Sequence, residues 1–183
     1  MKDIFNEVSE LVEKDTLDPT DHLCKLSEEH GELAKEINRV IGRKKRGKYT
    51  DVEILHNIKS ELCDNIQILF GITRCFNIKF ENLCITKNIF DEASNTNLKY
   101  RLCELAIEYG ELAKEIIIQV DDDDDDDTEV IENRIFGNIR VLFSIARCMN
   151  ITYEELCEEF ILKNQSYREN IENREILKNN FDN

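Results

Sequence analysis

The chain has 183 residues, of which 41% are hydrophobic, so it is long enough for one sizeable core or two small ones. One proline and six glycines, set against many Leu, Ile, Glu and Lys residues, favour helices over sheet. The formal net charge of −15 argues against a nucleic-acid-binding groove, which needs clustered cations, but it permits a small phosphorylated ligand bound with a divalent cation.

The N-terminal segment predicts a first amphipathic helix. Its hydrophobic stripe consists of Ile4, Phe5, Val8, Leu11 and Val12. No segment has the uninterrupted hydrophobic run of a signal peptide or of a membrane span. We therefore expect a cytoplasmic protein without a membrane partner.

Two long helices are expected next. Asp18 and Pro19 have the residue types of an N-cap and a first helical position, and the helix that they open runs to about Ile41. Thr50 and Glu53 predict a capping box at the start of a helix that continues to about residue 76.

A repeat organises the rest of the chain. Gly-Glu-Leu-Ala-Lys-Glu-Ile occurs at residues 31–37 and again at 110–116, and residues 65–84 align with residues 138–157. The second copy repeats the capping box with Thr152 and Glu155, and short turns are expected near Asn77 and Asn150. We predict an all-α helical bundle of two tandem repeats, residues 1–93 and 94–183, packed as a pseudo-dimer with two helical hairpins per copy.

The cysteines contain no C-x-x-C pair and lie within the hydrophobic pattern of the helices. We interpret them as reduced core thiols, because a disulfide set or a zinc site requires a different spacing and setting. The seven positions are Cys24, Cys63, Cys75, Cys84, Cys103, Cys148 and Cys157.

Two charged segments are interpreted as polar loops between helices. Residues 42–49 carry five cations, and residues 121–127 are seven successive aspartates, which cannot converge on one ion from a helix or a strand. As an alternative, the basic loop attracts a triphosphate. The segment from about Tyr167 is expected to extend the last helix or to cover the site.

Five carboxylates carry the candidate chemistry. Glu28, Glu29 and Glu32 gather along one side of the first long helix, and Glu61 and Asp64 occupy one end of a core-facing line on the next. Two charges about 4 Å apart repel by about 4 kcal/mol at an effective dielectric of ~20. A hard divalent cation removes this repulsion, and an all-oxygen ligand set suits Mg²⁺ or Mn²⁺.

The pattern E-E-x-x-E at residues 28–32, followed by E-x-x-D at residues 61–64, resembles the signature of the MazG-like all-α nucleoside triphosphate pyrophosphohydrolases, relatives of the dimeric dUTPases. The residues "GEL" after the first motif and "NIQILFGITR" after the second add to the resemblance. It covers nearly the whole chain when both copies are counted.

The resemblance implies a Mg²⁺-dependent hydrolase, with Mn²⁺ as an alternative metal, that converts NTP or dNTP and water to the monophosphate and pyrophosphate in nucleotide-pool house-cleaning. Glu29, Glu32, Glu61 and Asp64 would hold the metal. Glu28 would form a catalytic pair with Glu29 and would orient or deprotonate the attacking water. Lys87 and Asn88 are the nearest match to residues that bind phosphates in the family. Base and sugar preference are not predicted.

The second copy has lost most of these acids. Ile107, Arg134 and Gly137 stand where the first copy has Glu28, Glu61 and Asp64, while Glu108 and Glu111 remain. The second copy therefore cannot bind metal as the family does. We expect it to close the nucleotide pocket as the partner half, within a monomeric pseudo-dimer or a homodimer, and Arg134 either approaches substrate phosphates or pairs with Glu108 or Glu111.

Two other functional classes remain open. A catalytically silent nucleotide-binding or interaction module would keep the bundle and bind without turnover. A ferritin-like di-iron protein is disfavoured, because it needs two E-x-x-H elements and this chain has only the one from Glu53 to His56. The chain has no tryptophan for base stacking, and Tyr109, Phe5 and Phe80 are alternatives that are more typical of a core.

Overall fold

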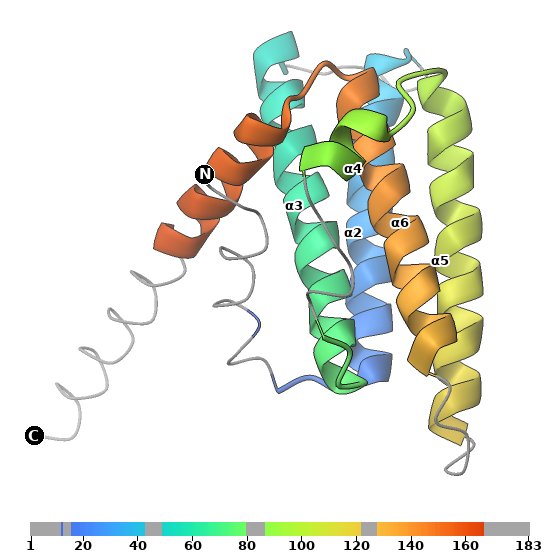
Figure 1. Cartoon of the computed structure of the whole chain (residues 1–183). Coiled ribbons are helices and arrows are strands. Elements are labelled where there is room, and N and C mark those ends of the chain that lie inside the picture. Colours follow the sequence, from blue (N-terminus) through green and yellow to red (C-terminus); the bar gives the residue numbers. More distant parts are fainter. Residues whose placement is uncertain (1–11, 13–15, 43–48, 80–86, 122–127, 167–183) are drawn as a thin grey trace, which may run out of the picture.

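The computed structural model describes residue 12 and residues 16–42, 49–79, 87–121 and 128–166. Over these residues the only regular secondary structure is helix, which confirms the all-α bundle. Four long helices lie side by side, and a short helix crosses beside them (Figure 1). The long helices are α2 (Pro19–Val40), α3 (Asp51–Cys75), α5 (Leu98–Asp121) and α6 (Thr128–Cys148), and the short one is α4 (Lys87–Glu92). A further helical segment, residues 153–166, follows α6 and lies against α3.

The predicted helix starts are confirmed in atomic detail. Oδ1 of Asp18 accepts a hydrogen bond from the backbone N of Asp21 at 2.8 Å, and Pro19 is the first helical residue. Thr50 and Glu53 exchange both hydrogen bonds of a capping box. Thr152 and Glu155 do the same before residues 153–166, with backbone-to-side-chain distances of 2.9 and 3.2 Å.

The turns after α3 and α6 use one device twice. Asn77 and Asn150 have φ values of 53° and 56°, in the left-handed region that asparagine tolerates better than most residues. The backbone N of Ile78 donates to the carbonyl of Thr73 at 2.9 Å, and the N of Ile151 donates to that of Ala146 at the same distance. Both helices therefore end in a Schellman motif.

The core runs through both hairpins. α2 packs most extensively on α3 and α5 on α6, while contacts between α3 and α6 and between α2 and α5 join the pairs. The fully buried side chains include Leu26, Leu33, Ile37, Leu62, Ile66, Phe70, Leu112, Ile116, Ile139, Leu142 and Phe143. The repeated heptapeptides lie on α2 and α5, the first helices of the hairpins. The interpretation of the hairpins as copies of one unit stays a prediction.

The cysteine prediction is partly wrong. The six described cysteines are free, and Cys63 and Cys157 are buried as expected. Cys24 and Cys103 are exposed instead. Each follows a hydrophobic residue but lies on the outer face of its helix, because one residue turns a helix by about 100°.

Several expectations fall outside the described residues. These are the first helix apart from Val12, which is buried, the interior of both charged loops (43–48 and 122–127), Phe5, Phe80, Cys84 and the segment from Tyr167. Among the described helices, none combines the length and hydrophobicity needed to cross a bilayer.

Candidate metal centre

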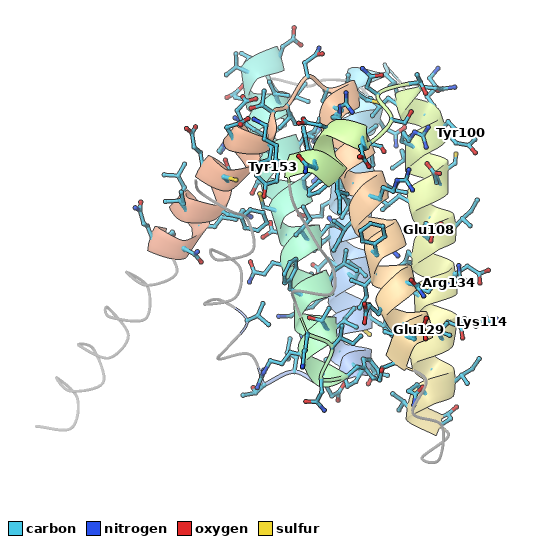
Figure 2. The ribbon with its side chains drawn as sticks, viewed as in Figure 1. Tyr100, Glu108, Lys114, Glu129, Arg134 and Tyr153 are labelled. Atoms are coloured by element: carbon cyan, nitrogen blue, oxygen red, sulfur yellow. The ribbon has the colours of Figure 1, made fainter. Side chains whose placement is uncertain are left out.

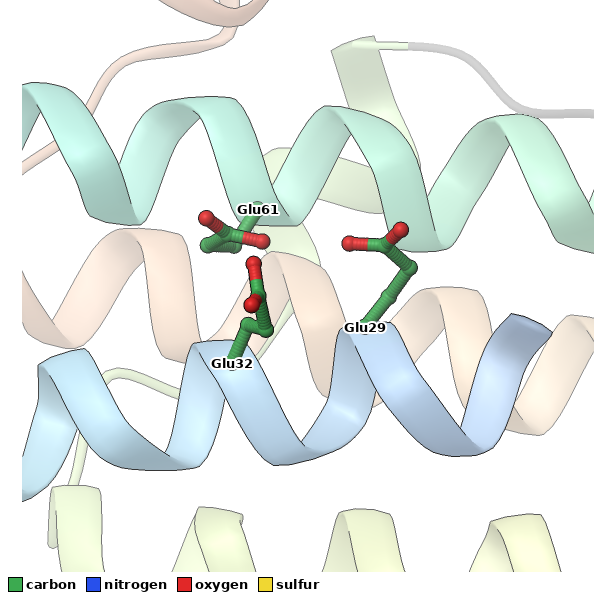
Figure 3. Close-up of side chains that lie close together, drawn as sticks. All are labelled: Glu29, Glu32 and Glu61. Atoms are coloured by element: carbon green, nitrogen blue, oxygen red, sulfur yellow. The ribbon is translucent and has the colours of Figure 1, made fainter. Parts of the chain in front are cut away.

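Three carboxylates from two helices meet between α2 and α3. Glu29 and Glu32 project from α2 toward Glu61 on α3 (Figure 3). One oxygen from each lies within 4.8 Å of the others. Glu29 and Glu61 are half-buried and Glu32 is exposed, so the group faces solvent on one side. A spacing of three residues on α2 places both of its acids on the side that faces α3.

Mutual repulsion and burial change the protonation of this group. Burial raises the pKa of Glu61 to about 7, helped by its hydrogen bond to Glu29 and by the charge of Glu32. Burial also raises the pKa of Glu29, and the negative charge of Asp64 raises it further. The hydrogen bond from Glu61 lowers the pKa of Glu29. Without a cation, the two carboxyl groups therefore share one proton. Glu61 holds it, and Glu29 accepts the hydrogen bond.

The donor set fits a hard divalent cation. Oε2 of Glu61 is buried and receives no hydrogen bond from a described residue. A buried carboxylate oxygen without a donor costs free energy, and a metal ion is one partner that satisfies it. Three carboxylates on one open side leave room for water and further oxygen ligands, as Mg²⁺ and Mn²⁺ require. Glu29, Glu32 and Glu61 could therefore hold such an ion.

Asp64, the fourth predicted ligand, has another partner in the structure. Its carboxylate forms an ion pair with the ammonium group of Lys163, which lies on the helical segment 153–166. The same segment contacts α3 through Lys59 and Glu155, 3.7 Å apart, and through Sγ of Cys63, which donates to the carbonyl of Leu156 at 3.8 Å. The second half of the chain thus reaches the acids of the first half.

Sequence reasoning missed Lys163. The signal was present, because Lys163 and Asn164 repeat the Lys-Asn pair of residues 87 and 88. The structure pairs Lys87 with Glu154 and leaves Asn88 exposed, so neither is brought to the three acids. Lys-Asn occurs three times in the sequence, at residues 87–88, 163–164 and 178–179, so the pattern does not single out Lys163, and the path of segment 153–166 is what brings it to Asp64.

Glu28 stays at the margin of the group. It is exposed on α2 and its charge contributes to the raised pKa of Glu29, but it is not among the three converging carboxylates. This position suits an outer acid that is in contact with water. Glu53, the acid of the lone E-x-x-H element, caps α3, and its pKa is lowered by the backbone hydrogen bond to Thr50. Among the described residues, its carboxylate is not one of the three that converge.

The second hairpin has an ion pair where the first has repelling acids. Nη2 of Arg134 lies 3.2 Å from Oε2 of Glu111, and Glu108 lies farther along the same side of α5 (Figure 2). The sequence left two roles for Arg134, contact with substrate phosphates or an ion pair with Glu108 or Glu111. The structure contains the ion pair with Glu111. Gly137 replaces Asp64 on the aligned turn of α6, so the second hairpin has no acid on that helix to face Glu108.

Tyr109 is part of the contact between the hairpins. Its ring meets that of His30 edge to face, with centroids 5.0 Å apart, and its hydroxyl donates to the carbonyl of Leu23 at 3.2 Å. Burial lowers the pKa of His30 to about 4, so this imidazole is neutral at pH 7. Both side chains therefore connect α2 to α5.

Comparison of the chain with protein-family models, with curated proteins and with solved structures gave no match.

Proposed function

We propose that the chain is a metal-dependent nucleoside triphosphate pyrophosphohydrolase of MazG-like type, which cleaves NTP or dNTP between the α and β phosphates. The observation that carries the proposal is the convergence of Glu29, Glu32 and Glu61 from two helices, with a raised pKa for Glu61. Carboxylates in a group whose pKa values are raised by burial and by one another are candidates for a functional site.

The residues have separable roles under this proposal. Glu29, Glu32 and Glu61 would hold Mg²⁺, and Asp64 would join them once its carboxylate exchanges Lys163 for the ion. A bound Mg²⁺ supplies charge neutralisation on phosphate oxygens and lowers the pKa of water. Glu28 is exposed to solvent next to Glu29, where a carboxylate can accept the proton of the attacking water.

Lys163 adds a cation next to the acids. Under this proposal, the ammonium group of Lys163 leaves Asp64 and binds a substrate phosphate. A cation at this place matters because the chain has a net charge of −15, and an acidic surface repels a triphosphate. The helical segment 153–166 would thereby contribute a group from the second half of the chain to the substrate of the first.

Pyrophosphate release tests the proposal. Wild type, Glu61→Gln and the matched variant Glu111→Gln are incubated with Mg²⁺ and a panel of ribo-, deoxyribo- and modified triphosphates, and one wild-type sample also contains a chelator. We expect turnover by wild type and by Glu111→Gln, and none by Glu61→Gln or in the chelated sample. Absence of turnover on every triphosphate by folded, Mg²⁺-loaded wild type would contradict the proposal.

A nucleotide-binding module without hydrolysis is the second candidate. The pairing of Asp64 with Lys163 favours it, because an ammonium group that stays on Asp64 leaves only three carboxylates for the ion. This alternative predicts that wild type binds a nonhydrolysable triphosphate in the presence of Mg²⁺ and releases no pyrophosphate. Equilibrium binding beside the turnover assay separates the two functions.

A further inference from the structure

The second hairpin contains a cavity of its own. It lies between α5 and α6, has a volume of about 390 Å³, and is bordered by the segment that follows α4. This volume is within the range of small-molecule sites. The cavity lies on the face of the second hairpin that corresponds to the acid-bearing face of the first, because Glu108 aligns with Glu29 and Gly137 with Asp64.

Two opposite charges line this cavity without pairing. Neither the carboxylate of Glu108 nor the guanidinium of Arg140 forms an ion pair or a hydrogen bond with any described residue. Unlike charges that share one cavity gain free energy when they meet. Their separation leaves an acceptor and a donor available to a third molecule.

Gly137 provides the space for Glu108. A Cβ atom at position 137 would lie 2.8 Å from Oε2 of Glu108, which is closer than side-chain atoms approach one another. Glycine inside a helix is destabilising by roughly 1 kcal/mol relative to alanine. Gly137 therefore destabilises α6 relative to alanine. In return, the carboxylate of Glu108 can lie over the helix backbone at the wall of the cavity.

The other polar residues that line the cavity also carry both positive and negative charges. Arg101 pairs with Glu104, yet its Nε atom is buried without a hydrogen-bond partner among the described residues. Ser94 and Ser144 add hydroxyl groups to the lining of the cavity, and Glu92 adds a third carboxylate. A simple anion meets three glutamates here and a simple cation meets two arginines, so neither is favoured alone.

We propose that this cavity binds a small molecule that carries both an acidic group and an amino group, with the acid on Arg140 and Arg101 and the amine on Glu108. An amino acid and a phosphorylated amine share this chemistry. The site lies apart from Glu29, Glu32 and Glu61, and it does not depend on the proposed hydrolase activity.

Titration calorimetry on the full chain tests the site. The probes are L-glutamine and O-phosphoethanolamine, which carry both groups, and inorganic phosphate, acetate and ethylammonium, which carry one. We expect at least one of the first two to bind with a Kd below about 10 mM, and the single-group probes to bind at least tenfold more weakly. The first two probes distinguish a carboxylate from a phosphate ligand.

Three variants assign the binding to the cavity. Glu108→Gln and Arg140→Gln should each weaken the bound probe by about tenfold or more, whereas Lys114→Gln and Glu129→Gln, on the same helices but outside the cavity lining (Figure 2), should leave it unchanged. Gly137→Ala should raise Tm, because alanine favours the helix, and should still weaken binding, because its methyl group displaces Glu108. This combination separates ligand binding from folding.

Three results would overturn the proposal. The first is failure of both L-glutamine and O-phosphoethanolamine to bind wild type. The second is binding of phosphate, acetate or ethylammonium that is as tight or tighter. The third is binding that is unchanged in Glu108→Gln and Arg140→Gln.

Discussion

The two hairpins are built alike and charged differently. α3 and α6 each contain a fully buried phenylalanine, Phe70 or Phe143, and each ends in the same Schellman turn. Asn65 and Asn138 are both fully buried and donate to the carbonyl four residues earlier, at 2.7 and 2.9 Å. These shared features belong to helix packing and helix ends.

The converging acids belong to the first hairpin. Glu29, Glu32 and Glu61 converge in the first, whereas the second has the pair Arg134 and Glu111. The second hairpin forms its helices and turns with Arg134 and Gly137 in place of Glu61 and Asp64, so helix packing there does not require these two acids. Burial and mutual repulsion disfavour the charged form of this cluster and raise the pKa values of Glu29 and Glu61.

The largest expected contrast concerns metal affinity. Glu32→Gln removes one of three converging carboxylates and should weaken Mn²⁺ binding by about 100-fold, in line with the loss of supporting metal-site groups. Glu111→Gln, the same change at the aligned position of the second hairpin, should alter it less than about twofold. Titration calorimetry with Mn²⁺ measures both, and equal effects would show that the first hairpin is not the metal centre.

The pH dependence of stability should also come from the first hairpin. The pKa of Glu61 rises from its ordinary value of 4.5 to about 7, so the folded state holds an extra proton between these pH values. The stabilisation that this proton gives the folded state is fully present below about pH 4.5. As pH rises toward 7, the free energy of unfolding falls by roughly 1 kcal/mol after allowance for solvent screening.

Urea unfolding across pH 4 to 8 measures this slope. Saturating Mn²⁺ should remove it by replacing the proton, and Glu61→Gln should remove it by deleting the titrating group. Arg134→Gln, at the aligned position of the second hairpin, should leave the slope in place. A slope that persists in Glu61→Gln belongs to another group.

The sequence predicted what depends on neighbouring residues. Capping residues such as Thr50 and Glu53 act over three positions, and the two asparagine turns act over a similar range, so local chemistry was sufficient. The convergence of Glu29 and Glu32 on Glu61 followed from helical spacing together with a hairpin.

Long-range contacts could not be predicted in the same way. The pairing of Asp64 with Lys163 joins residues 99 positions apart and depends on the direction of segment 153–166. Cys24 was placed in the core because hydrophobic neighbours surround it in sequence, but a single step around the helix exposes it. The separation of Glu108 from Arg140 depends on side-chain positions in a cavity, about which spacing gives no information.

A smaller effect is expected at Lys163. Lys163→Met removes the ammonium group from Asp64, so a divalent cation no longer competes with it, and Mn²⁺ affinity should rise about fivefold. Lys87→Met removes a lysine that pairs with Glu154 instead, and it should leave the affinity unchanged. Electron paramagnetic resonance of free Mn²⁺ reports both values. An unchanged affinity in Lys163→Met would mean that the ion pair does not compete with metal.

The smallest effect is expected at Arg134, where the two hairpins differ most in charge. The guanidinium and Glu111 are 36% and 43% exposed, so their ion pair is screened by water and Arg134→Ala should lower the free energy of unfolding by only about 0.5 kcal/mol. With its guanidinium held by Glu111, Arg134 should contribute little to turnover, and both KM and kcat should stay within about twofold of wild type. A rise in KM without loss of stability would instead place Arg134 on the substrate phosphates and make the second hairpin part of the nucleotide pocket.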